Sequence, residues 1–191
     1  MRLEHITLGV KQFEQQFDED VDITASLDLS KAKRMLHEKN RASHFPMHSI
    51  TRYANTTHRA QVIALWKAAF GYDAPHNAPG LVIDKKLAVQ DDLFFVALIE
   101  GRVVGTIMAG YDGHRGWLYS VAVHPDRRYQ GLGAALVWHA EKALTDRGCV
   151  KINLQIADGN ESVTGFYESL GFVTEKRVSM GKLISENVTP A

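Results

Sequence analysis

One stretch of the chain carries the residue types and the spacing needed to hold a phosphate group. Arg128, Gly131 and Gly133 follow a strand-like run that ends at Val123, and they stand where a helix-like run begins. The first turn of a helix presents backbone N–H groups without a partner inside the helix, and its dipole favours an anion. Glycines let a ligand approach the backbone without a Cβ in the way, and an arginine adds positive charge. The stretch therefore predicts a phosphate-binding loop.

Two common nucleotide-binding loops do not fit this stretch. A G-x-G-x-x-G loop would need a small residue where Leu136 stands, and the chain contains no G-x-x-x-x-G-K-[ST] string. What remains is R-x-x-G-x-G, which on its own is also compatible with a helix-start loop that binds nothing. Local charge favours a polyphosphate, because six basic residues outnumber three acidic ones between His114 and Lys151.

The composition of the whole chain narrows the class of protein. With 191 residues, of which 45% are hydrophobic and 23% charged, the chain is expected to form an ordinary globular domain with an appendage. Lys plus Arg equals Asp plus Glu at 22 each, so charge gives no argument for a nucleic-acid or membrane partner. Neither a long apolar run nor a secretory signal is evident, and a cytoplasmic location is expected. The single Cys149 excludes an internal disulfide and predicts a buried thiol.

The elements that must position the loop follow from hydrophobic spacing and turn residues. Residues 1–46 are predicted to be an extension, with a strand over 1–10 and a helix over 30–39, and residues 47–191 to be the main domain. In the main domain, the predicted strands are 50–54, 94–99, 103–109, 117–123, 151–156 and 173–182. The predicted helices are 56–70, 81–89, 133–146 and 161–170. Thr56 or Thr57 is expected to cap the first of them, and Gly148 and Gly171 to stop the last two. This order implies an α/β fold whose mixed sheet is covered by helices on both faces.

A second block makes the pattern more specific. Asn160-Glu-Ser-Val-Thr-Gly-Phe-Tyr-Glu-Ser-Leu-Gly-Phe172 begins about 30 residues after the glycine loop. The loop and this block, in this order, resemble the GNAT family of N-acetyltransferases, and the resemblance covers about residues 47–184. Within the family, the stretch 105–116 is similar to a small bacterial branch. The resemblance implies the GNAT fold, with a mixed, mostly antiparallel central sheet and helices on both faces.

The resemblance also implies a reaction and a coenzyme site. Acetyl-CoA would be the donor and a primary amine the acceptor, joined by direct attack in one ternary complex, and a homodimer is possible by analogy with the fold. The loop backbone would bind the pyrophosphate, the splayed end of the preceding strand would pair with the pantetheine arm, and an asparagine, which also suits a helix N-cap, would bond to that arm. The implied coenzyme-binding residues are Val121, Ala122, Val123, Arg128, Gln130, Gly131, Leu132, Gly133, Ala134, Asn160 and Tyr167.

Catalysis would need a proton donor and a proton acceptor. The resemblance makes Tyr167 the donor to the departing thiolate, since a thiol has a pKa near ~8.5 and a tyrosine one near ~10; core packing beside Phe166 is the alternative. The strand 117–123 carries no acidic side chain that could act as base. Proton removal is then left to water or to Asp112 and His114 in the preceding loop, although Asp112 also fits plain turn chemistry.

Two other classes of function remain open. A metal-dependent hydrolase would use Asp112, His114, His124 and His139, but the spacing of these residues matches no metal motif. A sensor that binds acyl-CoA without catalysis would explain the missing strand carboxylate. The acceptor follows no sequence code, and the loops 71–81 and 111–116 are expected to select it.

Overall fold

A five-stranded sheet organises the part of the chain that the computed structural model describes. These residues are 48–71 and 75–184, and they belong to the second of the two units into which the chain divides, Phe45–Ala191. The strand predicted over residues 1–10 and the helix predicted over 30–39 lie outside the described residues.

The sheet has the strand order β1-β2-β3-β4-β5. Its strands are β1 (Ser49–Arg52), β2 (Phe94–Ile99), β3 (Arg102–Tyr111), β4 (Gly116–Val123) and β5 (Ile152–Leu154). The first four strands pair antiparallel with their neighbours, whereas β5 runs parallel to β4 because a helix crosses over between them. The prediction of an α/β fold with a mixed, mostly antiparallel sheet is confirmed.

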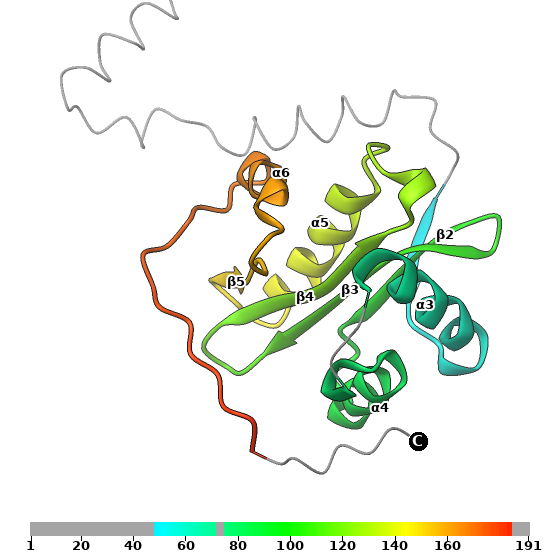
Figure 1. Cartoon of the computed structure of the whole chain (residues 1–191), viewed down its shortest axis with the longest axis horizontal. Helices are drawn as coiled ribbons and strands as arrows, with labels where there is room; N and C mark the ends of the chain where they lie inside the picture. Colours follow the sequence, from blue (N-terminus) through cyan, green and yellow to red (C-terminus); the bar gives the residue numbers. More distant parts are fainter. Residues whose placement is uncertain (1–47, 72–74, 185–191) are drawn as a thin grey trace, which may run out of the picture. The chain divides into compact units, whose positions relative to one another are not determined.

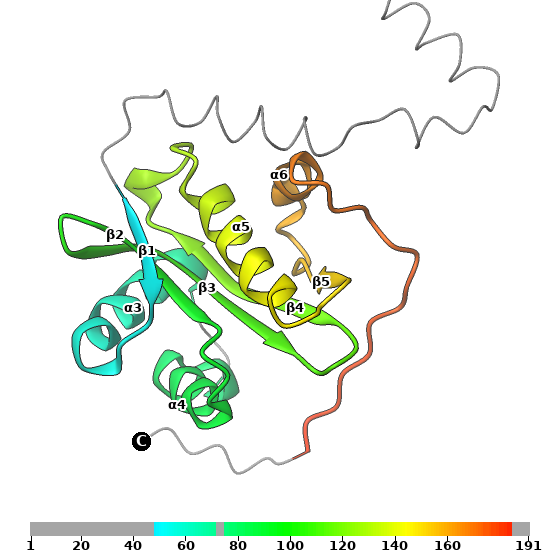
Figure 2. The same cartoon turned by 180° about the vertical axis from the view of Figure 1, so that it is seen from behind.

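Helices cover both faces of this sheet (Figures 1 and 2). The helices are α3 (Asn55–Phe70), α4 (Pro79–Val89), α5 (Leu132–Thr145) and the short α6 (Thr164–Ser169). Helices α3 and α4 lie on one face, and α5 lies on the other. Within residues 48–71 and 75–184, no helix is long and apolar enough to span a membrane.

Each face of the sheet buries its own apolar cluster. On the α3 face, Val62 and Trp66 pack in a buried cluster that includes Phe94 of β2. On the α5 face, Leu136 and Leu144 pack in a cluster that includes residues of β2, β3 and β4. Because successive strand residues point to opposite faces, β2 and β3 are apolar at nearly every position and supply both clusters.

Two helix starts differ from the predictions. Thr56 or Thr57 was expected to cap the first helix, but that helix begins at Asn55, and the backbone N–H of Ala54 donates to Nδ1 of His58 at 3.0 Å. Helix α4 begins at Pro79, inside the predicted loop. A proline suits the first helical turn because its missing N–H would have had no partner there.

The strand predicted over residues 173–182 is wrong, because the structure assigns no strand there. Val173, Val178 and Met180 are between 80% and 92% exposed. The segment reaches the end of the sheet only through side chains, with Gln155 donating to Ser179 and Lys151 pairing with Glu175. Strand β5 is three residues long, which leaves little backbone for a further strand to pair with.

Candidate active site

The glycine loop lies at the start of α5. Gly131 precedes the first helical residue with φ of 77°, a left-handed conformation that glycine adopts without steric cost. The first helical bond of α5 runs from the N–H of Ala135 to the carbonyl of Gly131, at 3.0 Å. The backbone N–H groups of the preceding turn therefore point out of the helix end, as the prediction of an anion site requires.

The two glycines of the loop are required at their positions for different physical reasons. A Cβ at Gly131 would meet nothing within 4 Å, so this position is open to a ligand. A Cβ at Gly133 would lie 3.1 Å from Cζ of Phe166, so a glycine there lets α6 pack closely on α5. The expectation that both glycines only clear a path for a ligand is therefore incomplete at Gly133.

Other predicted coenzyme residues differ in what they can offer. Arg128 is exposed, and the Gln130 side-chain amide donates to the carbonyl of Asp126 at 3.4 Å. The side chains of Leu132 and Ala122 are buried in the two apolar clusters. Only the backbone of these two residues is left to meet a ligand.

Strands β4 and β5 separate after a short stretch of pairing. They pair at Gly116, Trp117 and Leu118 of β4, and no further. The rest of β4, from Tyr119 to Val123, pairs with β3 on one side only, and the chain after β5 leads away toward α6 (Figure 1). This is the splayed strand end that the family resemblance implies, with unpaired backbone groups along one edge of β4.

A bulge interrupts β4 inside this splayed region. Met108 of β3 pairs with Tyr119, but Thr106 pairs with Ala122, so β4 has one extra residue between these pairs. Ser120 in the bulge has φ of 51°, which is uncommon for a residue other than glycine. Its carbonyl accepts a hydrogen bond from the hydroxyl of Thr106 at 3.0 Å, and that hydroxyl accepts one from the indole N–H of Trp66 at 2.8 Å.

Tyr167 of α6 is half-buried and packs against the apolar cluster on the α5 face of the sheet. Its ring makes edge contacts with Phe166 and Phe172, at centroid distances of 4.9 and 5.7 Å. Burial raises the pKa of Tyr167 above its ordinary value, so the hydroxyl stays protonated at neutral pH. Asn160 is exposed and precedes a short 3-10 turn, but its side chain makes no capping bond there, which leaves its amide available.

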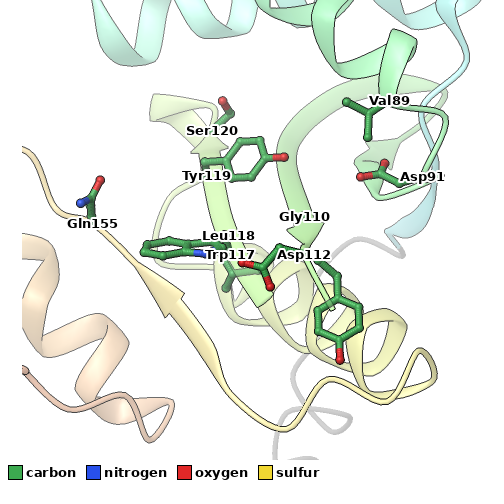
Figure 3. Close-up of a pocket in the computed structure, with 10 residues that line it drawn as sticks. Val89, Asp91, Gly110, Asp112, Trp117, Leu118, Tyr119, Ser120 and Gln155 are labelled. Carbon is green, nitrogen blue, oxygen red and sulfur yellow. The ribbon is translucent and has the colours of Figure 1, made fainter. Parts of the chain in front are cut away.

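A pocket of about 550 Å³ opens on β4 beside the bulge. Its lining comes from the end of α4, the turn before β2, the end of β3, β4 and the residue after β5, as Figure 3 shows. The lining residues are Val89, Asp91, Gly110, Tyr111, Asp112, Trp117, Leu118, Tyr119, Ser120 and Gln155. The predicted acceptor loop 111–116 thus contributes Tyr111 and Asp112.

Behind one wall of the pocket lies a buried lysine that the sequence did not single out. The ammonium of Lys86 bonds to the carboxylate of Asp91 at 2.5 Å and to the hydroxyl of Tyr119 at 3.3 Å. Burial lowers the pKa of Lys86, while Asp91 opposes that effect, and burial raises the pKa of Tyr119 to about 12. In Figure 3 the Tyr119 hydroxyl points toward the turn that carries Asp91. Spacing gave no signal, because Lys86 meets Tyr119, 33 residues later in the chain, only through the packing of α4 on the sheet.

The predicted bases separate in the structure. Asp112 lines the pocket, but its Oδ1 accepts hydrogen bonds from the backbone N–H groups of His114 and Arg115, at 2.7 and 2.6 Å. These bonds lower the pKa of Asp112, and they are the turn chemistry that was the alternative for this residue. His114 is exposed and is not part of the pocket lining.

The metal-site alternative has no geometric support in the described part of the chain. His139 packs its ring edge-on against Phe95, at a centroid distance of 4.6 Å, and His124 accepts a hydrogen bond from the backbone of Asp126. Among residues 48–71 and 75–184, no group of three or more His, Cys, Asp and Glu side chains is placed to hold a metal ion.

Comparison with known proteins assigns the family. A model of the Acetyltransferase (GNAT) family matches residues 59–172, so the chain belongs to this family of acetyltransferases. It is 43% identical over 126 residues to an acetyltransferase of Pectobacterium atrosepticum, covering 66% of this chain and 89% of that protein. It is 42% identical over 122 residues to an uncharacterized N-acetyltransferase of Yersinia pestis, covering 64% and 86%.

Solved structures agree on the fold. The PaiA N-acetyltransferase of Thermoplasma acidophilum, in complex with coenzyme A, matches with a TM-score of 0.60 at 17% identity. The match covers 69% of this chain and 93% of that chain. At this identity the likeness shows the fold alone.

Proposed function

We propose that the protein transfers an acetyl group from acetyl-CoA to a primary amine by direct attack in a ternary complex. The observation that carries the proposal is the separation of β4 from β5, immediately before the glycine-capped N-terminus of α5. The strand edge offers backbone groups to an extended arm, and the helix end offers N–H groups to phosphates. No other pair of neighbouring strands in the described part of the sheet offers both.

The coenzyme would be held mostly by main chain. The loop from Arg128 to Ala134 would bind the pyrophosphate, with Gly131 open to it and the exposed Arg128 adding charge. The edge of β4 from Val121 to Val123 would bond to the pantetheine arm, together with the side-chain amide of Asn160. When bound, acetyl-CoA supplies an activated acetyl group on a thiol leaving group.

The pocket on β4 would hold the acceptor amine. Asp112 brings a carboxylate to its lining, and Tyr111, Trp117 and Tyr119 bring aromatic rings. The second carboxylate of the lining, Asp91, is already paired with the buried Lys86. No basic side chain is among the lining residues. Carboxylates and ring faces attract ammonium groups and disfavour anions. The pocket therefore favours a cationic amine over one that carries a neighbouring carboxylate.

The chain's own groups would act on the sulfur's proton and on the negative charge that develops on the carbonyl oxygen. In the overall reaction the ammonium first loses one proton, and the nitrogen then bonds to the acetyl carbon and loses a second. The carbon–sulfur bond breaks and the sulfur gains one proton, so one proton is released in net. Tyr167 would give the sulfur its proton, since the phenol is protonated at neutral pH. The Val121 N–H, at the bulge, would donate to the carbonyl oxygen as negative charge develops there. Water would carry the amine's proton away.

Water-relayed proton removal predicts small effects at both candidate bases. Asp112→Asn and His114→Gln are each expected to keep kcat within about threefold, because a true general base contributes about 10²- to 10⁴-fold. Asparagine can still accept the two backbone bonds that Asp112 accepts, so the turn is preserved. Steady-state rates across pH 6–9 measure this, and a loss of about 100-fold in either variant would make that residue the base.

Binding and turnover together test the proposed function. Titration calorimetry with acetyl-CoA and free CoA is expected to show binding of both, and thiol release should then depend on an added amine. Two matched pairs test the pocket: tyramine against tyrosine, and cadaverine against lysine, with the amines lacking the carboxylate expected to react faster. Binding without thiol release from any amine would favour the catalytically inactive acyl-CoA sensor. Absence of binding would overturn both functions.

A further inference from the structure

Thr106 is a buried polar residue in the middle of an apolar cluster. Of the residues that the structure describes, Lys86 and Thr106 are the polar or charged ones that are buried, and Thr106 is 0% exposed. Trp66, also 0% exposed, comes from α3 and lies 40 residues earlier in the chain. Burying a hydroxyl is unfavourable unless its hydrogen bonds are satisfied, so a reason for this threonine lies in what its hydroxyl contacts.

The hydroxyl of Thr106 links the helix to the bulge. It accepts from the Trp66 indole N–H and donates its own hydrogen to the carbonyl of Ser120. An indole N–H can only donate, and a hydroxyl has a single hydrogen to give. The direction of this relay is therefore fixed: Trp66 holds the hydroxyl oxygen, and the hydroxyl hydrogen is left for Ser120.

The relay also sets the direction of the next N–H group. The peptide bonds of the described residues include no cis bond, and in a trans peptide the C=O and the following N–H point in opposite directions. Because the Ser120 carbonyl is held toward Thr106 on β3, the N–H of Val121 is directed away from β3. Beyond Leu118, β4 has no β5 partner, so this N–H belongs to a stretch of β4 whose second edge is open.

We propose that Thr106 and Trp66 are positioning residues that aim the Val121 N–H at the substrate carbonyl. The inference rests on the proposed acetyl transfer. Ser120 occupies a left-handed conformation that side-chain-bearing residues rarely adopt, and the hydrogen bond to its carbonyl offsets part of that strain. Without the hydrogen bonds from Trp66 to Thr106 and from Thr106 to Ser120, the peptide group between Ser120 and Val121 can rotate, and the Val121 N–H no longer has a fixed direction.

Three variants separate positioning from simple packing. Thr106→Val keeps the shape and removes the hydroxyl, Thr106→Ser restores it, and Trp66→Phe keeps an aromatic ring without the N–H. Gln61→Met is the matched control, since Gln61 also joins α3 to β3, by accepting from the N–H of Val103 at 3.0 Å, but away from the bulge. Thr106→Val and Gln61→Met each lose two hydrogen bonds, so their unfolding temperatures show how much of any effect on rate is structural.

The variants that break the relay are expected to change kcat and to leave the affinity for free CoA unchanged. Removing an oxyanion donor costs about 10²- to 10³-fold in kcat, so a misdirected donor in Thr106→Val should cost about 10- to 100-fold. Trp66→Phe should lose less, Thr106→Ser should recover to within about threefold of wild type, and Gln61→Met should keep its kcat. The dissociation constant for free CoA should not change in any of them.

A measurement that does not depend on activity tests this inference separately from the proposed function. The ¹⁵N–¹H spectrum of the free protein should show the Val121 amide shifted in Thr106→Val and Trp66→Phe, and unshifted in Thr106→Ser and Gln61→Met. If the wild-type protein releases no thiol with any amine, the proposed function fails, and the Val121 resonance still decides whether the relay aims this group. An unshifted Val121 amide in Thr106→Val, or an unchanged kcat beside an active wild type, would overturn the inference.

Discussion

Replacing Gly131 by glutamate is expected to abolish coenzyme binding. The glutamate would place a carboxylate at the helix end whose N–H groups are proposed to hold the pyrophosphate, and like charges repel in that position. It would also put a side chain on a residue with φ of 77°. An increase of about 100-fold or more in the dissociation constant for acetyl-CoA is expected, which corresponds to about 2.8 kcal/mol. Titration calorimetry with the purified variant measures it.

Gly148→Glu is the matched control for this prediction. Gly148 follows the opposite end of α5, has φ of 82°, and like Gly131 has nothing within 4 Å of an added Cβ. Both variants therefore carry the same backbone strain and the same added charge, and only one carries it at the proposed phosphate site. Equal affinities of Gly131→Glu and wild type would mean that the coenzyme binds elsewhere. Equal losses in both variants would mean that strain, and not the site, is responsible.

The second large effect is expected at Tyr167. Tyr167→Phe keeps the ring that packs between Phe166 and Phe172 and removes only the hydroxyl. A general acid contributes about 10²- to 10⁴-fold, so kcat should fall by about 100-fold or more. The dissociation constant for CoA should stay within about threefold of wild type, because the phenol acts on the departing sulfur. Single-turnover thiol release, which isolates chemistry from product release, is the measurement.

A second tyrosine provides the control for the loss of a hydroxyl. Tyr53 is also partly buried and stacked on an aromatic ring, that of Phe94 at 4.2 Å, and its hydroxyl donates to Asn55 outside the pocket and the loop. Tyr53→Phe should leave single-turnover rates unchanged. Full turnover in Tyr167→Phe under conditions where chemistry limits the rate would reduce Tyr167 to the packing role that was its alternative.

Much of the fold could be predicted because its signals are local. The strand predicted over 94–99 has the observed bounds, and the strongest predicted helix, 133–146, differs from α5 by one residue at each end. Gly148 and Gly171 stop helices where predicted, each with positive φ, since a helix end is decided by the residues within one turn of it. The family followed from two short blocks whose order and spacing are properties of the sequence alone.

The predictions that were wrong concern features that depend on the surroundings of a segment. Alternation over residues 173–182 predicted a strand, but a strand forms only where a neighbour offers its backbone, and the three-residue β5 does not. The N-cap position of α3 is taken by Ala54, whose N–H donates to His58, rather than by one of the threonines whose type favours that position. In both cases the local preference was present, and the surroundings decided otherwise.

The sequence by itself determined the family, the order of the elements and the loop at the start of α5. Only the tertiary structure decided how the active site is built around them. The bulge at Ser120 depends on the register of β4 against β3, and its support from Trp66 and Thr106 joins residues 40 apart in the chain. The bond from Lys86 to Tyr119 joins residues 33 apart. Such contacts depend on how helices dock on a sheet, and that docking follows from the burial of whole apolar faces rather than from any short pattern.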